Sequence, residues 1–230
     1  MSGLAVLVLA KSPEPGRVKT RLCPPLTPAQ AAELAAAALL DSIDAARAVP
    51  GARTVVVLTG LLERAARAAE IREALRGVVV VPQRGDGLGA RIAAAHRDGG
   101  AGLRTLQIGM DTPQVDAALL GEADHALLTP GVDAVLGPAA DGGWWALGLR
   151  RPSDARLVAT VPTSRDDTGA RTLHALRQGG LRVALLPELS DVDTVGDAVA
   201  VAARAPGTRF AAAVRALPAG ALRQAAGQRV

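Results

Sequence analysis

Four positively charged side chains lie within residues 11–21, near the start of the chain. They are Lys11, Arg17, Lys19 and Arg21, and its two lysines are the only ones in a chain that otherwise uses arginine for its cations. A lysine ammonium is a compact charge on a flexible stem, which suits contact with phosphate oxygens. Gly16 would let a phosphate approach the backbone closely. The segment predicts a di- or triphosphate site, with an ordinary surface loop as the alternative.

Asp111 follows the strand expected at residues 103–109 and comes two residues before Pro113. A carboxylate at the end of a strand is well placed to hold Mg²⁺, or Mn²⁺, against phosphate oxygens. Asp111 or Thr112 could instead cap a helix that begins after Pro113. The basic segment expected at the same sheet edge favours the metal site.

Asp191 and Asp193 lie one residue apart near the end of the folded region. In an extended turn, residues i and i+2 point the same way, so both carboxylates can share one divalent cation. The alternative is a helix N-terminus, with Asp193 as the cap and Asp191 stabilised by the helix dipole. Both interpretations stay open for different residues.

A turn of Asp141, Gly142 and Gly143 precedes two tryptophans, Trp144 and Trp145. The glycines permit a tight turn and close approach of a substrate. Adjacent side chains in a strand face opposite sides, so one indole is expected in the core and the other beside an acceptor. Asp141 is predicted to orient the acceptor and Gly142, Gly143 and Trp144 to bind it; a plain turn between strands is the alternative.

Residues 83–89 form another glycine-containing segment, in which Gln83 and Gly87 either line a nucleotide pocket or precede a helix. The glycines lack dinucleotide-site spacing.

The three histidines, at positions 96, 125 and 174, lack zinc-ligand spacing and are interpreted as surface or packing residues.

Strands and helices alternate along most of the chain, which predicts a mostly parallel sheet covered on both faces. Strands are expected at residues 4–10, 54–59, 78–81, 103–109, 133–137, 144–149 and 181–186. Helices are expected at residues 27–49, 61–76, 88–97, 115–127, 165–178 and 195–204. Because the carboxyl ends of parallel strands meet at one edge, the basic and acidic segments are expected to converge on a single pocket.

The chain has 230 residues, of which 49% are hydrophobic, so one domain over 1–205 is expected, with a short helix and a flexible tail over 206–230. An aromatic fraction of 1% argues against nucleic-acid modules that stack bases on aromatic side chains. The net charge of +4 is interpreted as the excess of arginines on a solvated surface that carries charges of both signs. No apolar run approaches the length of a membrane span, no signal peptide is evident and Cys23 is the only cysteine, so we expect a cytoplasmic protein.

Five segments together resemble the motifs of an uncharacterised bacterial GT-A-like transferase family, in order: residues 11–22, 83–91, 109–113, 137–143 and 186–194. Its members are often described as glycosyltransferases or as transferases associated with radical-SAM and selenium-domain neighbourhoods. The family is distantly similar to phospholactate guanylyltransferases and molybdenum-cofactor nucleotidyltransferases. The resemblance implies a three-layer, Rossmann-like GT-A fold with Asp111 as a metal ligand. Met110 replaces a common serine, and Trp144 and Trp145 stand where tyrosine is usual.

The leading hypothesis is magnesium-dependent nucleotidyl transfer from a nucleoside triphosphate to a phosphorylated or carboxylated small molecule, with release of pyrophosphate. Lys19, Asp111 and Asp141 are the predicted catalytic residues, and Asp111, Asp191 and Asp193 the predicted metal ligands. Glycosyl transfer from a nucleotide-sugar is the second hypothesis, and a non-catalytic nucleotide-binding module is the third. No nucleic-acid or membrane partner is expected, and the sequence leaves the oligomeric state open.

Overall fold

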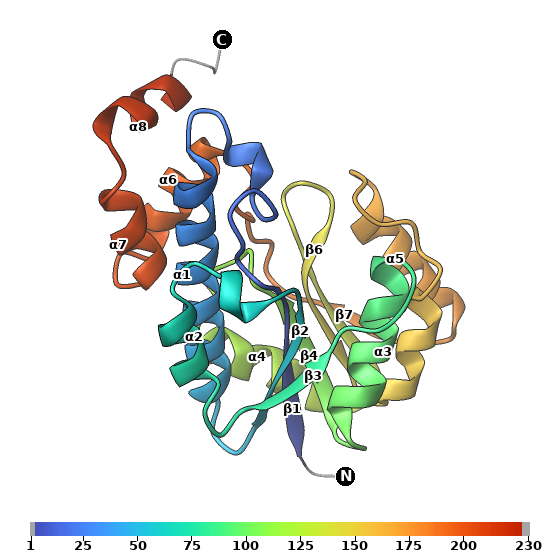
Figure 1. The fold of residues 1–230 in the computed structure, drawn as a ribbon. Helices are drawn as coiled ribbons and strands as arrows, with labels where there is room; N and C mark the ends of the chain where they lie inside the picture. Colours follow the sequence, from blue (N-terminus) through green and yellow to red (C-terminus); the bar gives the residue numbers. More distant parts are fainter. Residues whose placement is uncertain (1–2, 227–230) are drawn as a thin grey trace.

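The computed structural model describes residues 3–226 as a seven-stranded sheet between two layers of helices (Figure 1). The strands are β1 (Leu4–Lys11), β2 (Arg53–Thr59), β3 (Val79–Pro82), β4 (Arg104–Gly109), β5 (Ala134–Pro138), β6 (Trp144–Leu149) and β7 (Val183–Leu185). The helices are α1 (Pro28–Arg47), α2 (Ala68–Ala74), α3 (Leu88–Gly100), α4 (Ala117–Leu128), α5 (Thr168–Gln178), α6 (Val195–Arg204), α7 (Arg209–Arg215) and α8 (Ala219–Ala226). Three short 3₁₀ helices are η1 (Thr20–Leu22), η2 (Leu62–Arg64) and η3 (Pro152–Val158).

The strand order is β3-β2-β1-β4-β6-β5-β7, and only β6 runs antiparallel to its neighbours. The expected mostly parallel sheet, covered on both faces, is therefore confirmed. Leu7 of β1 lies opposite Gln107 of β4, which in turn lies opposite Leu147 of β6. This register places the segments after β1 and β4 beside the segment that enters β6, at one edge of the sheet.

Two apolar cores hold the layers together. One face of the sheet packs against α1 and α4 through residues such as Leu39 and Leu120, and the other packs against α3, η3 and α5 through residues such as Ile92 and Leu176. Helix α1 begins with the expected capping box, in which the Thr27 hydroxyl accepts from the Gln30 backbone N–H and the Gln30 side chain accepts from that of Thr27.

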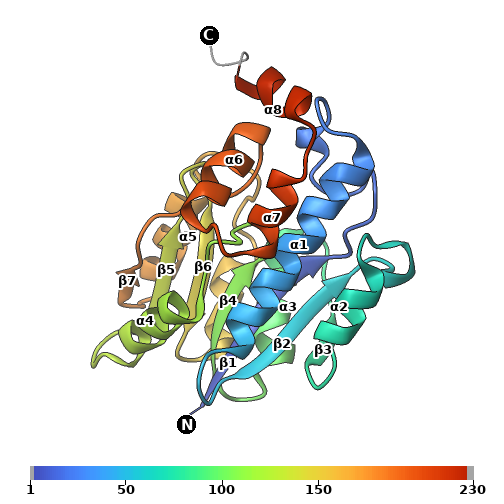
Figure 2. The same cartoon turned by 90° about the vertical axis from the view of Figure 1, so that its left-hand side faces the viewer.

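Figure 2 shows α7 lying along α1, with α6 beside it. Phe210 of α7 is fully buried in a third core with Leu34 of α1 and Val201 of α6. Asp41 of α1 accepts hydrogen bonds from the backbone N–H groups of Arg209 and Phe210 at 3.0 and 2.8 Å. The segment predicted to hold one short helix holds two, and residues 227–230 of the expected tail lie outside the described residues.

Three predicted helix starts are wrong. The 61–76 helix is divided into η2 and α2 because Arg67 adopts a left-handed conformation, with φ of 53°. The helix after Pro113 begins only at Ala117 with Asp116 as its cap, and the 165–178 helix begins at Thr168 with Asp167 preceding it. In the last two cases a polar loop replaces the expected first turn, and both loops border the candidate site.

Candidate functional site

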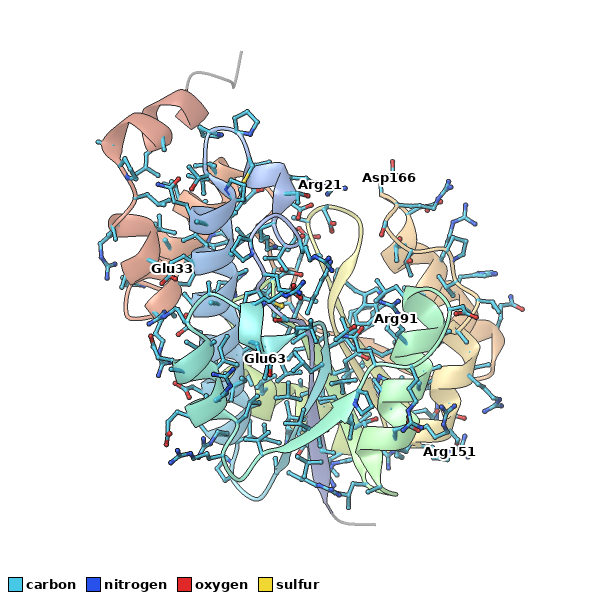
Figure 3. The ribbon with its side chains drawn as sticks, in the orientation of Figure 1. Arg21, Glu33, Glu63, Arg91, Arg151 and Asp166 are labelled. Atoms are coloured by element: carbon cyan, nitrogen blue, oxygen red, sulfur yellow. The ribbon has the colours of Figure 1, made fainter. Side chains whose placement is uncertain are left out.

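A cavity of about 620 Å³ opens at the edge of the sheet where β1 and β4 end and β6 begins. Figure 3 labels three of its lining residues, Arg21 after β1, Arg91 on α3 and Asp166 before α5, which come from different segments around it. Its charged lining residues are Lys11, Arg21, Arg91, Arg165, Asp111, Asp141, Asp166, Asp191 and Asp193. Cations and carboxylates from distant parts of the sequence thus face one space.

Lys19 links the basic segment to both acidic segments. Its ammonium lies 2.5 Å from Asp111 Oδ1 and also donates a hydrogen bond to the Val192 carbonyl. The Val192 backbone N–H donates to the Asp111 carbonyl at 3.1 Å, so the two acidic loops are also joined directly. The Lys19 side chain is only 9% exposed, and its backbone adopts the left-handed conformation with φ of 48°, which is uncommon for a lysine. The predicted convergence of these three segments is confirmed.

Arg21 makes a second link, through an ion pair with the Asp193 carboxylate. Its guanidinium remains largely exposed and lines the cavity, so it keeps donors for a ligand. Lys11 also lines the cavity and donates from Nζ to the Arg17 carbonyl at 2.7 Å. Arg17 itself is exposed beside Glu14, 3.8 Å away, and Gly16, Arg17 and Lys19 are not among the lining residues.

Asp141, Asp191 and Asp193 form a cluster in which one carboxylate oxygen from each residue lies within 4.8 Å of the others. Burial, first, and then the charges of Asp141 and Asp193 raise the pKa of Asp191 to about 6. Asp111 is not in this group among the described residues, because its carboxylate lies against Lys19. The structure therefore brings together two of the three predicted metal ligands and adds Asp141.

The capping alternatives for these aspartates are wrong. Thr194 caps α6, with Asp197 completing a capping box, so Asp193 is not the cap. Asp116 caps α4, so neither Asp111 nor Thr112 has that role. An all-oxygen cluster of neighbouring carboxylates has the donor chemistry that Mg²⁺ and Mn²⁺ prefer, and a cation would relieve the repulsion that raises the Asp191 pKa.

The glycines of the predicted acceptor turn differ in their surroundings. A Cβ on Gly142, which has a φ of +86°, would lie 1.8 Å from the Asp166 carbonyl oxygen, and the Gly169 N–H donates to the Gly142 carbonyl at 2.7 Å. Gly142 therefore lets the β5–β6 loop pack on the segment that leads into α5. Gly143 lines the cavity, and its N–H donates to Asp141 Oδ1 at 2.8 Å.

A register shift at Gly137 and Pro138 separates the two tryptophans. Trp145 is 3% exposed and donates from Nε1 to the Pro187 carbonyl at 2.9 Å. Trp144 is partly exposed, lines the cavity and packs toward the α3 and α5 side of the sheet. Such bulges redirect side chains. The expectation of one core and one pocket tryptophan is confirmed, and binding of an acceptor by Trp144 stays a prediction.

Gln83 lines the cavity, and its carboxamide nitrogen donates to the carbonyls of Ala10 and Val57 at 2.8 and 3.1 Å. Both amide protons are therefore directed at the sheet edge, which leaves the oxygen as an acceptor. Gly87 precedes α3 as its N-cap residue with a φ of 87°, and it is not among the lining residues.

Sequence reasoning missed several lining residues. Arg91 lies in the first turn of α3, Arg165 before α5, and Gln107 inside β4. A glutamine between Leu106 and Ile108, inside a predicted strand, was a visible signal for Gln107. Arg165 gave none, because it is one of many arginines and only the packing of the α5 entry loop on Gly142 brings it to the site.

A family model described as "Uncharacterized protein conserved in bacteria (DUF2064)" matches residues 42–165, more than half of the chain. The chain belongs to the DUF2064 family. This family covers the segments with Gln83, Asp111 and Asp141, whereas the basic segment and Asp191 lie outside the matched span. No curated protein matches the DUF2064 chain in sequence.

Solved structures resemble this DUF2064 protein over nearly its whole length. A protein from Desulfovibrio desulfuricans G20, described as a candidate nucleotide-diphospho-sugar transferase, is 28% identical with a TM-score of 0.82, covering 97% of this chain and 98% of that one. The expected nucleotide-diphospho-sugar-transferase-like fold is confirmed.

Two more distant structures share the fold alone. CMP:2-keto-3-deoxy-manno-octonic acid synthetase complexed with CTP is 12% identical with a TM-score of 0.53, covering 85% of this chain and 95% of that one. The mannosyltransferase PcManGT from Pyrobaculum calidifontis, in complex with GDP-Man and Mn²⁺, is 16% identical with a TM-score of 0.54, covering 94% of this chain and 65% of that one.

Within residues 3–226, the helices are too short or too polar to cross a membrane.

Proposed function

We propose that this DUF2064 protein is a nucleotide-dependent transferase that moves a nucleotidyl group from a nucleoside triphosphate to a phosphorylated or carboxylated small molecule. The coarser statement, transfer that depends on a nucleotide, is supported by the relatives of known or described activity, which are nucleotidyltransferases and glycosyltransferases. The finer statement rests on the site: Lys19 contacts both acidic loops, whose aspartates line the same cavity as Lys11 and Arg21.

The reaction is an in-line displacement at phosphorus. An oxygen of the acceptor's phosphate or carboxylate forms a bond to the α-phosphorus, the bond from that phosphorus to the bridging oxygen breaks, and pyrophosphate leaves with the electron pair. Such a reaction needs no protein nucleophile, because positioning and neutralisation of charge lower the barrier. Lys11 and Arg21 would hold the phosphates, and Lys19 would hold Asp111 and the second acidic loop in place while contributing positive charge.

Asp141, Asp191 and Asp193 would hold a divalent cation, Mg²⁺ or Mn²⁺, because they supply three neighbouring carboxylate oxygens at the cavity. The bound cation supplies charge neutralisation to phosphate oxygens. Arg21, paired with Asp193, would orient that carboxylate at the rim of the cavity. Asp111 as a direct metal ligand stays a prediction, which the variants argued in the Discussion test.

Glycosyl transfer from a nucleotide-sugar is the second candidate, favoured by the relative at 28% identity, which is described as a candidate nucleotide-diphospho-sugar transferase. The same cations and carboxylates would then neutralise a departing nucleoside diphosphate. Arg165 and Trp144, which line the same cavity as Lys11, would contact the sugar or acceptor.

The test is a thermal-shift screen of nucleoside triphosphates and nucleotide-sugars with Mg²⁺ or Mn²⁺, followed by measurement of pyrophosphate release with a panel of small phosphates and carboxylates. A ligand at a hundredfold excess over its dissociation constant stabilises the fold by about 2.7 kcal/mol. Lys19→Ala should abolish the shift, whereas Arg204→Ala, which changes an exposed arginine on α6, should keep it.

The outcomes separate the candidates. Pyrophosphate release supports nucleotidyl transfer, and tight binding of nucleotide-sugars with weak binding of triphosphates supports glycosyl transfer. Binding without turnover, unaffected by chelator, would identify a binding module. Equal shifts in the Lys19 and Arg204 variants would show that the basic segment is not the phosphate site.

A further inference from the structure

Gln107 is a polar residue buried in the floor of the cavity without a hydrogen-bond partner for its carboxamide oxygen among residues 3–226. It lies in β4, between Leu7 of β1 and Leu147 of β6, and is 2% exposed. An apolar residue of the same shape would pack there without an unpaired polar atom, so the position as it stands costs stability. Because Gln107 lines the cavity, a ligand bound there could donate the missing hydrogen bond to its carboxamide oxygen.

Thr105 provides an internal comparison, because it precedes Gln107 by two residues and so faces the same side of the sheet. Thr105 is also fully buried, but its hydroxyl lies 2.7 Å from Nδ1 of His96 on α3 and does not line the cavity. The fold therefore supplies a hydrogen-bond partner for Thr105, which lies outside the cavity. It supplies none for the carboxamide oxygen of Gln107, which lines the cavity.

A second atom repeats the pattern. The Thr112 hydroxyl, next to Asp111, is buried without a partner and lines the same cavity. Among the described residues, four buried side-chain polar atoms lack a partner: those of Gln107 and Thr112 line this cavity, and His96 Nε2 and Gln114 Oε1 lie outside it. Buried polar atoms in folded proteins are nearly always satisfied, by protein, water or ligand.

We propose that the Gln107 carboxamide hydrogen-bonds the base of the nucleotide and contributes to its selection. This inference rests on the proposed function. Leu9 of β1 and Ile92 of α3 line the cavity together with Gln107, so the cavity also offers aliphatic side chains that suit a flat ring. Of the groups in the proposed reaction, the phosphates and the acceptor's reactive group are charged, whereas the ribose and the base are uncharged and carry donors and acceptors. Of these two, only the base is a flat ring that suits the aliphatic lining.

The position along the strand agrees with this assignment. Gln107 lies four residues before Asp111, or about 13 Å along an extended chain. A nucleotide with its phosphates at the charged rim would therefore place its base, the far end of the molecule, toward Gln107. A carboxamide can present both a donor and an acceptor to the edge of a base.

The experiment compares Gln107→Met, which keeps the length of the side chain and removes the amide, with the wild type and with Thr105→Val. Calorimetry measures binding of ATP, CTP, GTP, UTP and inorganic triphosphate with Mg²⁺, and thermal unfolding is measured without ligand. Gln107→Met should weaken the preferred nucleotide about tenfold, since one hydrogen bond is lost, and leave inorganic triphosphate unchanged. The ligand-free variant should melt about 3 °C higher, because an unpaired buried polar group is gone.

Thr105→Val should have the opposite signature, a lower melting temperature with unchanged nucleotide affinity, because it breaks the hydrogen bond to His96 outside the cavity. Equal nucleotide affinities in the wild type and Gln107→Met would overturn the inference, as would an equal loss for inorganic triphosphate. If the wild type binds no nucleotide at all, the proposed function fails, and that result is distinct from equal binding by the two proteins.

Discussion

At the scale of single residues, the site combines positive and negative charges from positions as far apart in the sequence as Lys19 and Asp193. Lys19 pairs with Asp111, Arg21 pairs with Asp193, and burial, followed by the charges of Asp141 and Asp193, raises the pKa of Asp191. Asp111 therefore has an ammonium as its partner, whereas Asp191 lies beside two other carboxylates. Their roles toward a cation should differ in the same way.

Substitutions at three of the four aspartates separate these roles. Asp141→Asn and Asp191→Asn should each weaken Mn²⁺ binding about tenfold or more, because each removes one charged oxygen ligand from the cluster. Asp111→Asn should change Mn²⁺ affinity less, since its carboxylate already pairs with Lys19. Calorimetric titration with Mn²⁺ measures each affinity, with Glu122→Gln on the exposed side of α4 as the control. A larger loss in Asp111→Asn than in Asp141→Asn would restore Asp111 as the ligand.

At the scale of elements, the site depends on loops that pack on one another rather than on the strands alone. The β5–β6 loop, which carries Asp141, lies against the segment that leads into α5, and Gly142 permits the contact. The 190–193 loop is held by Gln114, whose side chain donates to the Ser190 carbonyl at 2.6 Å. The position of the carboxylate cluster therefore follows from these loop contacts.

Gly142→Ala tests the first of these contacts. The added Cβ would meet the Asp166 carbonyl at 1.8 Å, so the loop must move, and we expect a loss of about 2–3 kcal/mol in the free energy of unfolding together with weaker cation binding. Gly180→Ala is a matched control, because Gly180 also has a positive φ, 82°, but open space around its Cβ. It should cost about 1 kcal/mol from backbone strain and leave cation binding unchanged. Similar results for both variants, from urea unfolding and Mn²⁺ titration, would mean the loop contact is unimportant.

The contact of α7 with α1 is a second element-scale feature, at a distance from the cavity. Phe210 is 1% exposed among residues of α1 and α6, and truncation to alanine leaves a cavity. Phe210→Ala should lower the free energy of unfolding by about 3–5 kcal/mol, measured by urea denaturation, whereas Val199→Ala on the exposed side of α6 should change it by less than about 0.5 kcal/mol. A change below 1 kcal/mol in Phe210→Ala would show that α7 does not stabilise the fold, as expected of a separate appendage.

At the scale of the whole molecule, the sheet was predictable because its strands are short apolar runs separated by helices with clear signals, such as Thr27 and Gln30 at the start of α1. Convergence of Lys19 and Asp111 also followed, since parallel strands end at one edge. What the sequence could not show depends on packing between distant segments. Asp141 lies in the carboxylate cluster and α7 packs in the core only because the packing of distant segments places them there.

His96 connects one buried side chain to the stability of the whole molecule. It is fully buried on α3, and burial lowers its pKa from 6.5 to about 3. The folded protein therefore keeps His96 neutral in the range where the unfolded chain takes up a proton. Stability from this group is fully present above pH 6.5 and is lost as the pH falls from there toward 3, at about 1.4 kcal/mol per pH unit. At pH 5 the loss amounts to about 2 kcal/mol.

The His96→Gln variant isolates this contribution, because glutamine does not titrate between pH 5 and 7. Replacement at pH 7 should destabilise the fold, since Thr105 loses its partner. On going from pH 7 to pH 5, the difference in the free energy of unfolding between wild type and variant should shrink by about 2 kcal/mol, measured by urea denaturation. His125→Gln and His174→Gln, at exposed positions, should keep the wild-type dependence. A difference that stays constant across this range would mean that His96 takes up a proton equally in the folded and unfolded states.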